Sequence, residues 1–155
     1  MNTFFYDTWA FVALADADDA GHGVAAELDL QLEERGYVAV TTDYVLDETV
    51  TLLSREAGSG VAIEFLDGLL ARSAAAELQL LDVDADRRTR ACAIFRRLAP
   101  EARQLSFTDA TSFAVMHELG IVHAFTADQH FHRAGRGIRP LLERRGRRFR
   151  ADALA

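Results

Sequence analysis

The chain has 155 residues, half of them hydrophobic, which suits one folded domain and excludes an intrinsically disordered chain. It contains a single cysteine, and no apolar run approaches the ~18 residues of a membrane span, so an intrachain disulfide and a membrane-spanning helix are not expected. The formal net charge is −7, and the N-terminus lacks a basic segment followed by an apolar one, so we expect a cytoplasmic protein.

The first half of the chain alternates predicted strands with predicted helices. Aromatic and β-branched runs mark the strands, and apolar residues at helical spacing mark the helices. In chain order the segments are a strand at residues 3–7, a short helix or turn at 8–15, a helix at 20–35, a strand at 37–41 and helices at 43–55 and 61–73. The last two helices are separated by Gly58-Ser59-Gly60 and are expected to form a helical hairpin.

The second half continues the same alternation. The segments are a strand at residues 77–83, a helix through Leu98 capped by Asp84 or Asp86, a helix from Thr108 or Asp109 to Gly120, a strand at 121–127, and finally a short helix, a turn and a last strand. Strands that alternate with helices favour an α/β domain with a mainly parallel sheet. We find no internal repeat, linker or domain boundary.

Aspartates follow two of the predicted strands. Asp7 comes directly after the first strand, and Asp128 comes after the fourth. Ligands of open parallel sheets bind outside the carboxyl ends of the strands, so both residues lie where such folds place their chemistry. Capping of the next helix is the alternative role for each of them.

Two further acids belong to predicted helices. Asp109 shares a helical stripe with Phe113 and Met116, so a carboxylate heads a core-facing stripe, although capping is an alternative here too. Glu48 lies one turn into the helix after the second strand, next to Asp47. Adjacent helical residues diverge by about 100°, so only one of these two acids can face a shared pocket, and the helical wheel does not choose between them.

The order and spacing of these acids resemble a PIN-domain nuclease, most closely a VapC-type toxin of a prokaryotic toxin–antitoxin system. The resemblance is carried by Asp-Thr after the first strand, Glu in a following helix, Thr-Asp-Ala opening a late helix, and the ending FTADQHFHRAG. It implies a single PIN-like domain over residues 1–155, folded as a three-layer α/β/α sandwich. The catalytic and metal-binding acids that it implies are Asp7, Glu48, Asp109 and Asp128.

The resemblance also implies an activity, a cofactor and partners. Crowded carboxylates need a cation, Mg²⁺ or Mn²⁺ prefers oxygen ligands, and a metal-bound water can attack a phosphodiester. The implied protein is therefore an Mg²⁺- or Mn²⁺-dependent endoribonuclease acting as a toxin. A small antitoxin would cover the acidic pocket of a homodimer and supply the only DNA contact, with no membrane partner. The alternative is a catalytically inert or RNA-processing PIN scaffold that binds RNA or protein.

Two other α/β classes are excluded. A signalling receiver domain needs a lysine near its last strand, and this chain contains no lysine. A haloacid-dehalogenase-type phosphatase needs a second aspartate two residues after the first, where this chain has Trp9.

Several polar residues adjoin the four acids. The candidates for contact with the pocket or substrate are Thr8, Thr108, Thr126 and His130, with capping, turn bonds or packing as the alternative. Four histidines in the last third of the chain also suggest zinc. They come without an HExxH motif or a cysteine partner, so a hard metal ion bound by the carboxylates explains more of the candidate residues than a zinc site does.

Charge is distributed unevenly along the chain. Residues 1–132 hold 9 of the 17 basic residues and 22 of the 24 acidic ones, whereas residues 133–150 hold eight arginines and one glutamate. Arginines in such a segment can bind RNA phosphates or an acidic partner, and a solvated tail is the alternative. The candidates for RNA or antitoxin contact are Arg133, Arg136, Arg144, Arg145, Arg147 and Arg148.

Overall fold

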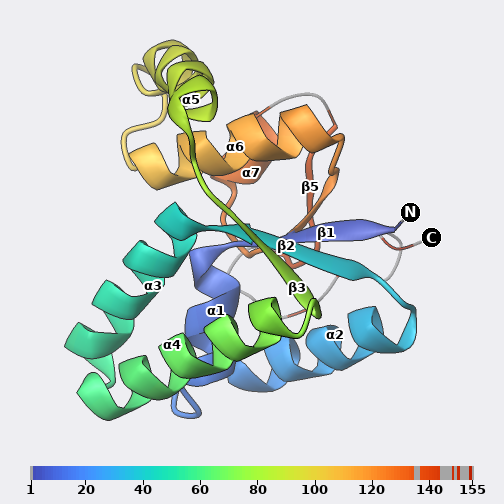
Figure 1. Ribbon diagram of the computed structural model, residues 1–155. Helices are drawn as coiled ribbons and strands as arrows, with labels where there is room; N and C mark the ends of the chain where they lie inside the picture. The colour runs from blue at the N-terminus through green and yellow to red at the C-terminus, as the bar shows by residue number, and fades with distance from the viewer. Residues whose placement is uncertain (1, 135–136, 144–147, 149, 151–153, 155) are drawn as a thin grey trace.

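A five-stranded sheet forms the centre of the computed structural model, which describes residues 2–134, 137–143, 148, 150 and 154 (Figure 1). The strands are β1 (Thr3–Tyr6), β2 (Val38–Thr42), β3 (Leu78–Leu81), β4 (His123–Phe125) and β5 (Arg139–Pro140). They are ordered β3-β2-β1-β4-β5, and every neighbouring pair is parallel. The predicted mainly parallel α/β sheet is therefore confirmed.

Helices cover both faces of this sheet. They are α1 (Thr8–Ala15), α2 (His22–Glu34), α3 (Asp43–Glu56), α4 (Ser59–Ala74), α5 (Ala85–Leu98), α6 (Phe107–Leu119) and the short α7 (His130–Arg133). In Figure 1, α1, α2 and α4 lie below the sheet while α5, α6 and α7 lie above it, which gives the expected three layers. Helices α3 and α4 pack side by side as the predicted helical hairpin.

The central strand β1 is buried on both faces, which explains its unbroken aromatic sequence. Phe4, Phe5 and Tyr6 are each at most 3% exposed. The ring of Tyr6 stacks on Phe11 of α1 with their centroids 4.5 Å apart and meets Phe125 of β4 edge to face. The apolar burial of this strand fixes the position of the residue that follows it, Asp7.

Hydrogen bonds explain two of the element boundaries that differ from the sequence expectation. Helix α6 is capped by Ser106, whose side chain accepts a hydrogen bond from the Asp109 N–H, so neither Thr108 nor Asp109 is the N-cap. The strand expected at 121–127 is shorter because the N–H of Thr126 donates to the carbonyl of Ala124, which turns the chain out of the ladder. Of the two caps proposed for α5, Asp84 is the one that accepts from the first turn.

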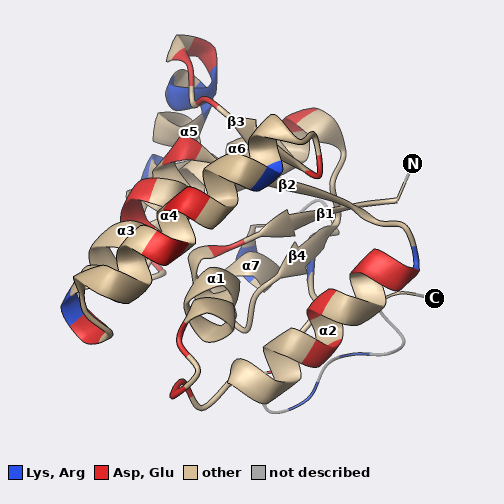
Figure 2. Ribbon diagram, turned by 60° about the horizontal axis from the view of Figure 1, so that its bottom comes forward, with Lys and Arg blue, Asp and Glu red and all other residues tan. Residues whose placement is uncertain are grey.

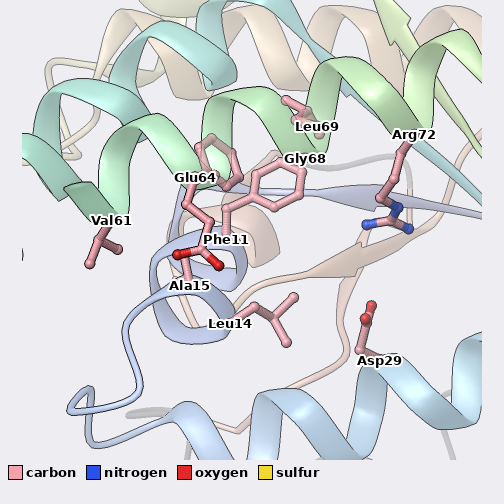
Figure 3. Close-up of a pocket in the computed structure, with 10 residues that line it drawn as sticks. Phe11, Leu14, Ala15, Asp29, Val61, Glu64, Gly68, Leu69 and Arg72 are labelled. Carbon is pink, nitrogen blue, oxygen red and sulfur yellow. The ribbon is translucent and has the colours of Figure 1, made fainter. Parts of the chain in front are cut away.

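A hollow of about 400 Å³ lies on the lower face of the molecule, between α1, α2 and α4 (Figure 3). Its apolar wall includes Phe11 and Leu14 of α1 and Leu69 of α4. Asp29 and Arg72 point toward one another across it, and the Tyr6 hydroxyl donates a hydrogen bond to Asp29.

Among the described residues, no helix is both long enough and apolar enough to cross a lipid bilayer.

Candidate active site

Asp7 lies at the carboxyl end of β1, the middle strand of the sheet. It is the N-cap residue of α1, but its side chain makes no capping bond to that helix, so the carboxyl group is left for another role. Only 4% of the residue is exposed. Its Oδ2 accepts a hydrogen bond from the Thr126 hydroxyl at 2.6 Å. The carboxyl group is thus held at the floor of a site and does not cap a helix.

Asp128 is joined to Asp7 through the same threonine. The Thr126 hydroxyl, which donates to Asp7, accepts a bond from the Asp128 N–H at 3.0 Å. Oδ1 of Asp128 accepts from the His130 N–H at 2.9 Å, so this carboxylate also stabilises the turn into α7. Thr126 is a pocket candidate that links two of the acids, and its bond to Asp7 joins residues 119 apart in sequence.

Asp109 combines a structural bond with a place in the same site. Its Oδ2 accepts from the Ser106 N–H at 3.0 Å, and the Ser106 hydroxyl accepts from the Asp109 N–H, which completes a capping box. The residue is 6% exposed. Helix α6 therefore fixes this carboxylate through its own first turn.

Glu48, and not Asp47, is the acid of α3 that turns toward the site. The Thr8 hydroxyl donates to Glu48 Oε2 at 2.6 Å, while Asp47 is exposed. The helical wheel did not distinguish Glu48 from Asp47, and this contact between α1 and α3 identifies Glu48.

A cavity of about 540 Å³ brings the predicted acids together. Asp7, Glu48, Asp109 and Asp128 all line it, together with Thr8 and His130. Thr108 is not among the lining residues; its carbonyl accepts a bond from the Thr111 hydroxyl. The four acids therefore converge as their order along the chain suggested.

Sequence reasoning missed several other residues of the cavity wall. Glu56 is one, and the i, i+4, i+8 spacing of Glu48, Leu52 and Glu56 was a usable signal for it. Ser106 is another, which the Ser-x-x-Asp capping pattern could have identified. Asp19 and Gln104 lie in connecting segments, where no periodicity points to them.

The electrostatics of the cavity disfavour a full set of negative charges. Burial, and then the charges of Asp109 and Asp128, raise the pKa of Asp7 to about 8, although the Thr126 hydrogen bond opposes the shift. Burial also raises the pKa of Asp109 to about 6, against the bond from Ser106, with the charges of Asp128 and Glu48 adding to the rise. A cation in the cavity would relieve both effects.

The donor atoms of the cavity fit a divalent cation. Oxygens of Asp109 and Asp128 and a ring nitrogen of His130 lie within 4.8 Å of one another. The Nδ1 atom of His130 is buried and has no hydrogen-bond partner in the part of the chain that the structure describes. Carboxylate oxygens and imidazole nitrogens are both common ligands of divalent metals.

The arginine candidates are only partly covered by the described residues. Arg133 is exposed and donates from Nη1 to the Glu101 carbonyl at 3.3 Å, and Arg148 is exposed. The others, Arg136, Arg144, Arg145 and Arg147, lie outside the described residues. A second basic group on α5 was not anticipated: five of its fourteen residues are arginines, visible as blue segments in Figure 2.

Comparisons with known proteins agree on one family. The PIN domain model matches residues 4–137. The 23S rRNA-specific endonuclease VapC20 of Mycobacterium tuberculosis is 37% identical over 131 residues, which cover 84% of this chain and 93% of that protein. The crystal structure of M. tuberculosis VapC20, a sarcin-ricin loop cleaving toxin, superposes with a TM-score of 0.74 at 36% identity, covering 88% of this chain and 99% of the other.

Two more distant structures share the fold. VapBC2 from Rickettsia felis, bound to a DNA fragment from its promoter, has a TM-score of 0.62 at 15% identity and covers 85% of this chain and 92% of its own. DNA-bound VapBC from Salmonella typhimurium has a TM-score of 0.61 at 16% identity, with coverages of 90% and 97%.

Proposed function

This chain belongs to the PIN-domain family, and from that premise we propose that it is a metal-dependent endoribonuclease and the toxin of a toxin–antitoxin pair. The observation that carries the proposal is the convergence of four acids in one cavity at the carboxyl edge of the sheet. Because VapC20 is 37% identical over most of this chain and is an endonuclease specific for 23S rRNA, the proposed substrate is large-subunit ribosomal RNA, cut at a structured loop.

In this proposal Asp7, Glu48, Asp109 and Asp128 hold Mg²⁺ or Mn²⁺. When bound, the ion supplies an acidified water and stabilises charge that develops on the phosphate. The chain itself positions the acids: Thr126 holds Asp7 at the floor, and Thr8 holds Glu48 from the side. Glu48 is half-buried, so its carboxylate reaches the open part of the cavity and is placed to orient the attacking water.

The proposed partner is a small antitoxin whose segment covers the acidic cavity. The carboxylates would attract a basic side chain of that segment, which would neutralise them as a cation does. The proposal includes a homodimer within the complex and DNA contact through the antitoxin alone.

The activity is tested on a short RNA that carries the sarcin-ricin loop, beside an RNA with the loop scrambled. We expect a single cut in the intact loop, dependent on Mg²⁺ or Mn²⁺ and stopped by EDTA. Asp7→Asn should lower the cleavage rate by at least about 100-fold, the upper end of the loss from removing groups that only support metal ligands. Asp47→Asn is the matched control, because Asp47 is exposed beside the site, and it should cleave normally.

Two results would contradict the proposal. Cleavage that survives both EDTA and Asp7→Asn would come from a contaminating nuclease or from another site. Tight RNA binding without any cut by the wild-type protein, with either metal, would support the inert scaffold.

A further inference from the structure

His130 stands in the acidic cavity with an unused ring nitrogen. It belongs to α7, and its side chain is 18% exposed. Its Nδ1 is buried and makes no hydrogen bond to any described residue. A buried polar atom without a partner costs free energy, so its environment calls for one. Carboxylate oxygens lie within ion-pair distance of this nitrogen, at 3.3 Å in Asp128 and 3.8 Å in Asp109.

The spacing of these atoms is that of ligands around one ion. Neighbouring ligands of an octahedral ion, each about 2.1 Å from it, lie roughly 3 Å apart. His130 Nδ1 lies 3.3 Å from the Asp128 oxygen, which is close to this value, and 3.8 Å from the Asp109 oxygen, and all three donor atoms fall within 4.8 Å of one another. With its proton on Nε2, the neutral imidazole offers the Nδ1 lone pair to a cation.

The contacts that position α7 do not use this nitrogen. The backbone N–H of His130 already donates to Asp128 Oδ1, which accounts for the turn into α7 without the imidazole. Packing of α7 is provided by Phe131, which is fully buried against Phe113 of α6 with ring centroids 4.9 Å apart. Neither contact requires a histidine at position 130.

We propose that His130 is a metal ligand through Nδ1 and that this nitrogen makes the site prefer Mn²⁺ to Mg²⁺. The inference rests on the metal-dependent activity proposed above and adds a fifth residue to the four acids. Mg²⁺ is served by oxygen ligands and water, whereas imidazole suits transition-metal ions, so replacing one oxygen by nitrogen favours Mn²⁺.

The test is pulsed electron paramagnetic resonance of Mn²⁺ bound to the full chain, with no RNA and no turnover. We expect the electron spin echo of Mn²⁺ to be modulated by the ¹⁴N nucleus of a directly bound imidazole. In protein grown with ¹⁵N-histidine, the ¹⁴N modulation should be replaced by the pattern of ¹⁵N. This isotope arm uses the wild-type fold and needs no substitution. His130→Gln should lose the nitrogen signal, whereas His132→Gln, at an exposed position of the same helix, should keep it.

Metal titrations give an independent readout of the preference. For the wild type we expect Mn²⁺ to bind at least about tenfold more tightly than Mg²⁺, and for His130→Gln we expect most of this ratio to disappear. The melting temperature in EDTA shows whether each variant is folded.

The outcomes separate this inference from the function it rests on. Saturable Mn²⁺ binding that Asp109→Asn removes, but without histidine nitrogen coupling, would overturn the role of His130 and leave the metal-dependent nuclease intact. Nitrogen coupling that persists in His130→Gln would also overturn it. If no saturable Mn²⁺ or Mg²⁺ binding is found, the metal dependence itself fails.

Discussion

Asp7 is a carboxylic acid in a place where most folds would put an apolar residue. It follows a strand whose last three residues are each at most 3% exposed, and among the described residues no arginine forms an ion pair with it. The Thr126 hydroxyl supplies one hydrogen bond, which is too little to offset burial beside two other acids. The site therefore carries a cost in folding free energy that the proposed cation would remove.

This cost predicts an unusual pH dependence for the metal-free protein. The pKa of Asp7 is raised to about 8 in the folded state, far above the value near 4 of an unfolded aspartate. Between these values the folded chain binds more protons than the unfolded chain, so stability falls as pH rises from about 4 to 8. We expect Asp7→Asn, which is never charged, to raise the free energy of unfolding at pH 8 by roughly 2 kcal/mol or more.

Urea denaturation in EDTA at pH 5 and pH 8 measures this difference. The exposed Asp47→Asn is the control and should keep the wild-type slope with pH. Wild-type protein that gains stability from pH 5 to pH 8 without metal would contradict the raised pKa.

The convergence of the acids was predicted from their combined order along the chain and from the family resemblance, but their contacts were not. Each falls after a strand or near a helix start, and position in a parallel sheet is enough to place them at one edge. The preference for Glu48 over Asp47 depends on the Thr8 hydroxyl, and the link between Asp7 and Asp128 depends on Thr126. Hydrogen bonds between residues 40 and 119 apart leave no periodic signal in a single sequence.

Among the elements, α6 holds a catalytic candidate through its own capping box. Ser106 and Asp109 exchange two hydrogen bonds, so the first turn of the helix and the orientation of the carboxylate depend on each other. Helix capping therefore contributes directly to the geometry of the site.

Ser106→Ala tests this coupling at the level of the helix. Removal of the hydroxyl eliminates the bond to the Asp109 N–H and should lower the free energy of unfolding by about 1 kcal/mol. The Ser106 N–H still reaches Asp109, so the acid stays in the cavity and metal affinity should fall only a few fold. Chemical denaturation and metal titration measure the two effects.

Ser106→Thr is the matched variant, because it keeps a capping hydroxyl, and it should restore most of the stability. A Ser106→Ala protein as stable as the wild type would show that the cap is not used in solution.

The presence of each helix and strand was predicted from the periodicity of apolar residues. The residues at which they begin and end depend on side-chain hydrogen bonds that the sequence pattern does not show. The alternation of strands and helices was predicted correctly along the chain because apolar spacing marks each segment. The start of α6 was misplaced, since Thr108 and Asp109 look like good caps and only the reciprocal bonds of Ser106 distinguish them. Strand β4 was predicted to be too long because the apolar run IVHAFTA extends beyond both ends of the three residues that form the strand.

At the scale of the whole molecule, negative charge would repel RNA. Acidic residues are spread over α2, α3 and α4 in Figure 2, and basic residues gather on α5 and in residues 133–150. An RNA that approaches the acidic cavity therefore needs arginines beside it to offset the repulsion.

We expect the C-terminal arginines to bind RNA without taking part in the chemistry. Changing Arg144, Arg145, Arg147 and Arg148 together to Gln should weaken RNA binding most at low salt. The reason is that removing one arginine–phosphate interaction reduces the slope of log affinity against log salt by roughly 0.7 for single-stranded RNA. The single-turnover cleavage rate at saturating RNA should change little. Salt titrations of RNA affinity beside single-turnover rates measure both.

The control changes Arg88, Arg96 and Arg97 of α5 to Gln, all exposed in the structure. An equal decrease of the salt slope per arginine removed in both variants would mean that net charge alone is responsible. A quadruple variant that keeps its full slope and loses its saturated rate would reverse the proposed division of roles.

The strand order has a consequence for the synthesis of the protein on the ribosome. Strand β1 is made before β2 and β4, although it lies between them in the sheet. The carboxyl group of Asp7 can therefore bond to Thr126 only after 119 more residues have been made, and Asp128 and His130 join the cavity later still. At about 5–20 residues per second, translation separates these residues by roughly 6–24 s. A nascent chain thus has no assembled cavity until residues 126–130 have been made. An enzyme proposed to cut ribosomal RNA would therefore have no assembled active site while residues 8–125 are being made.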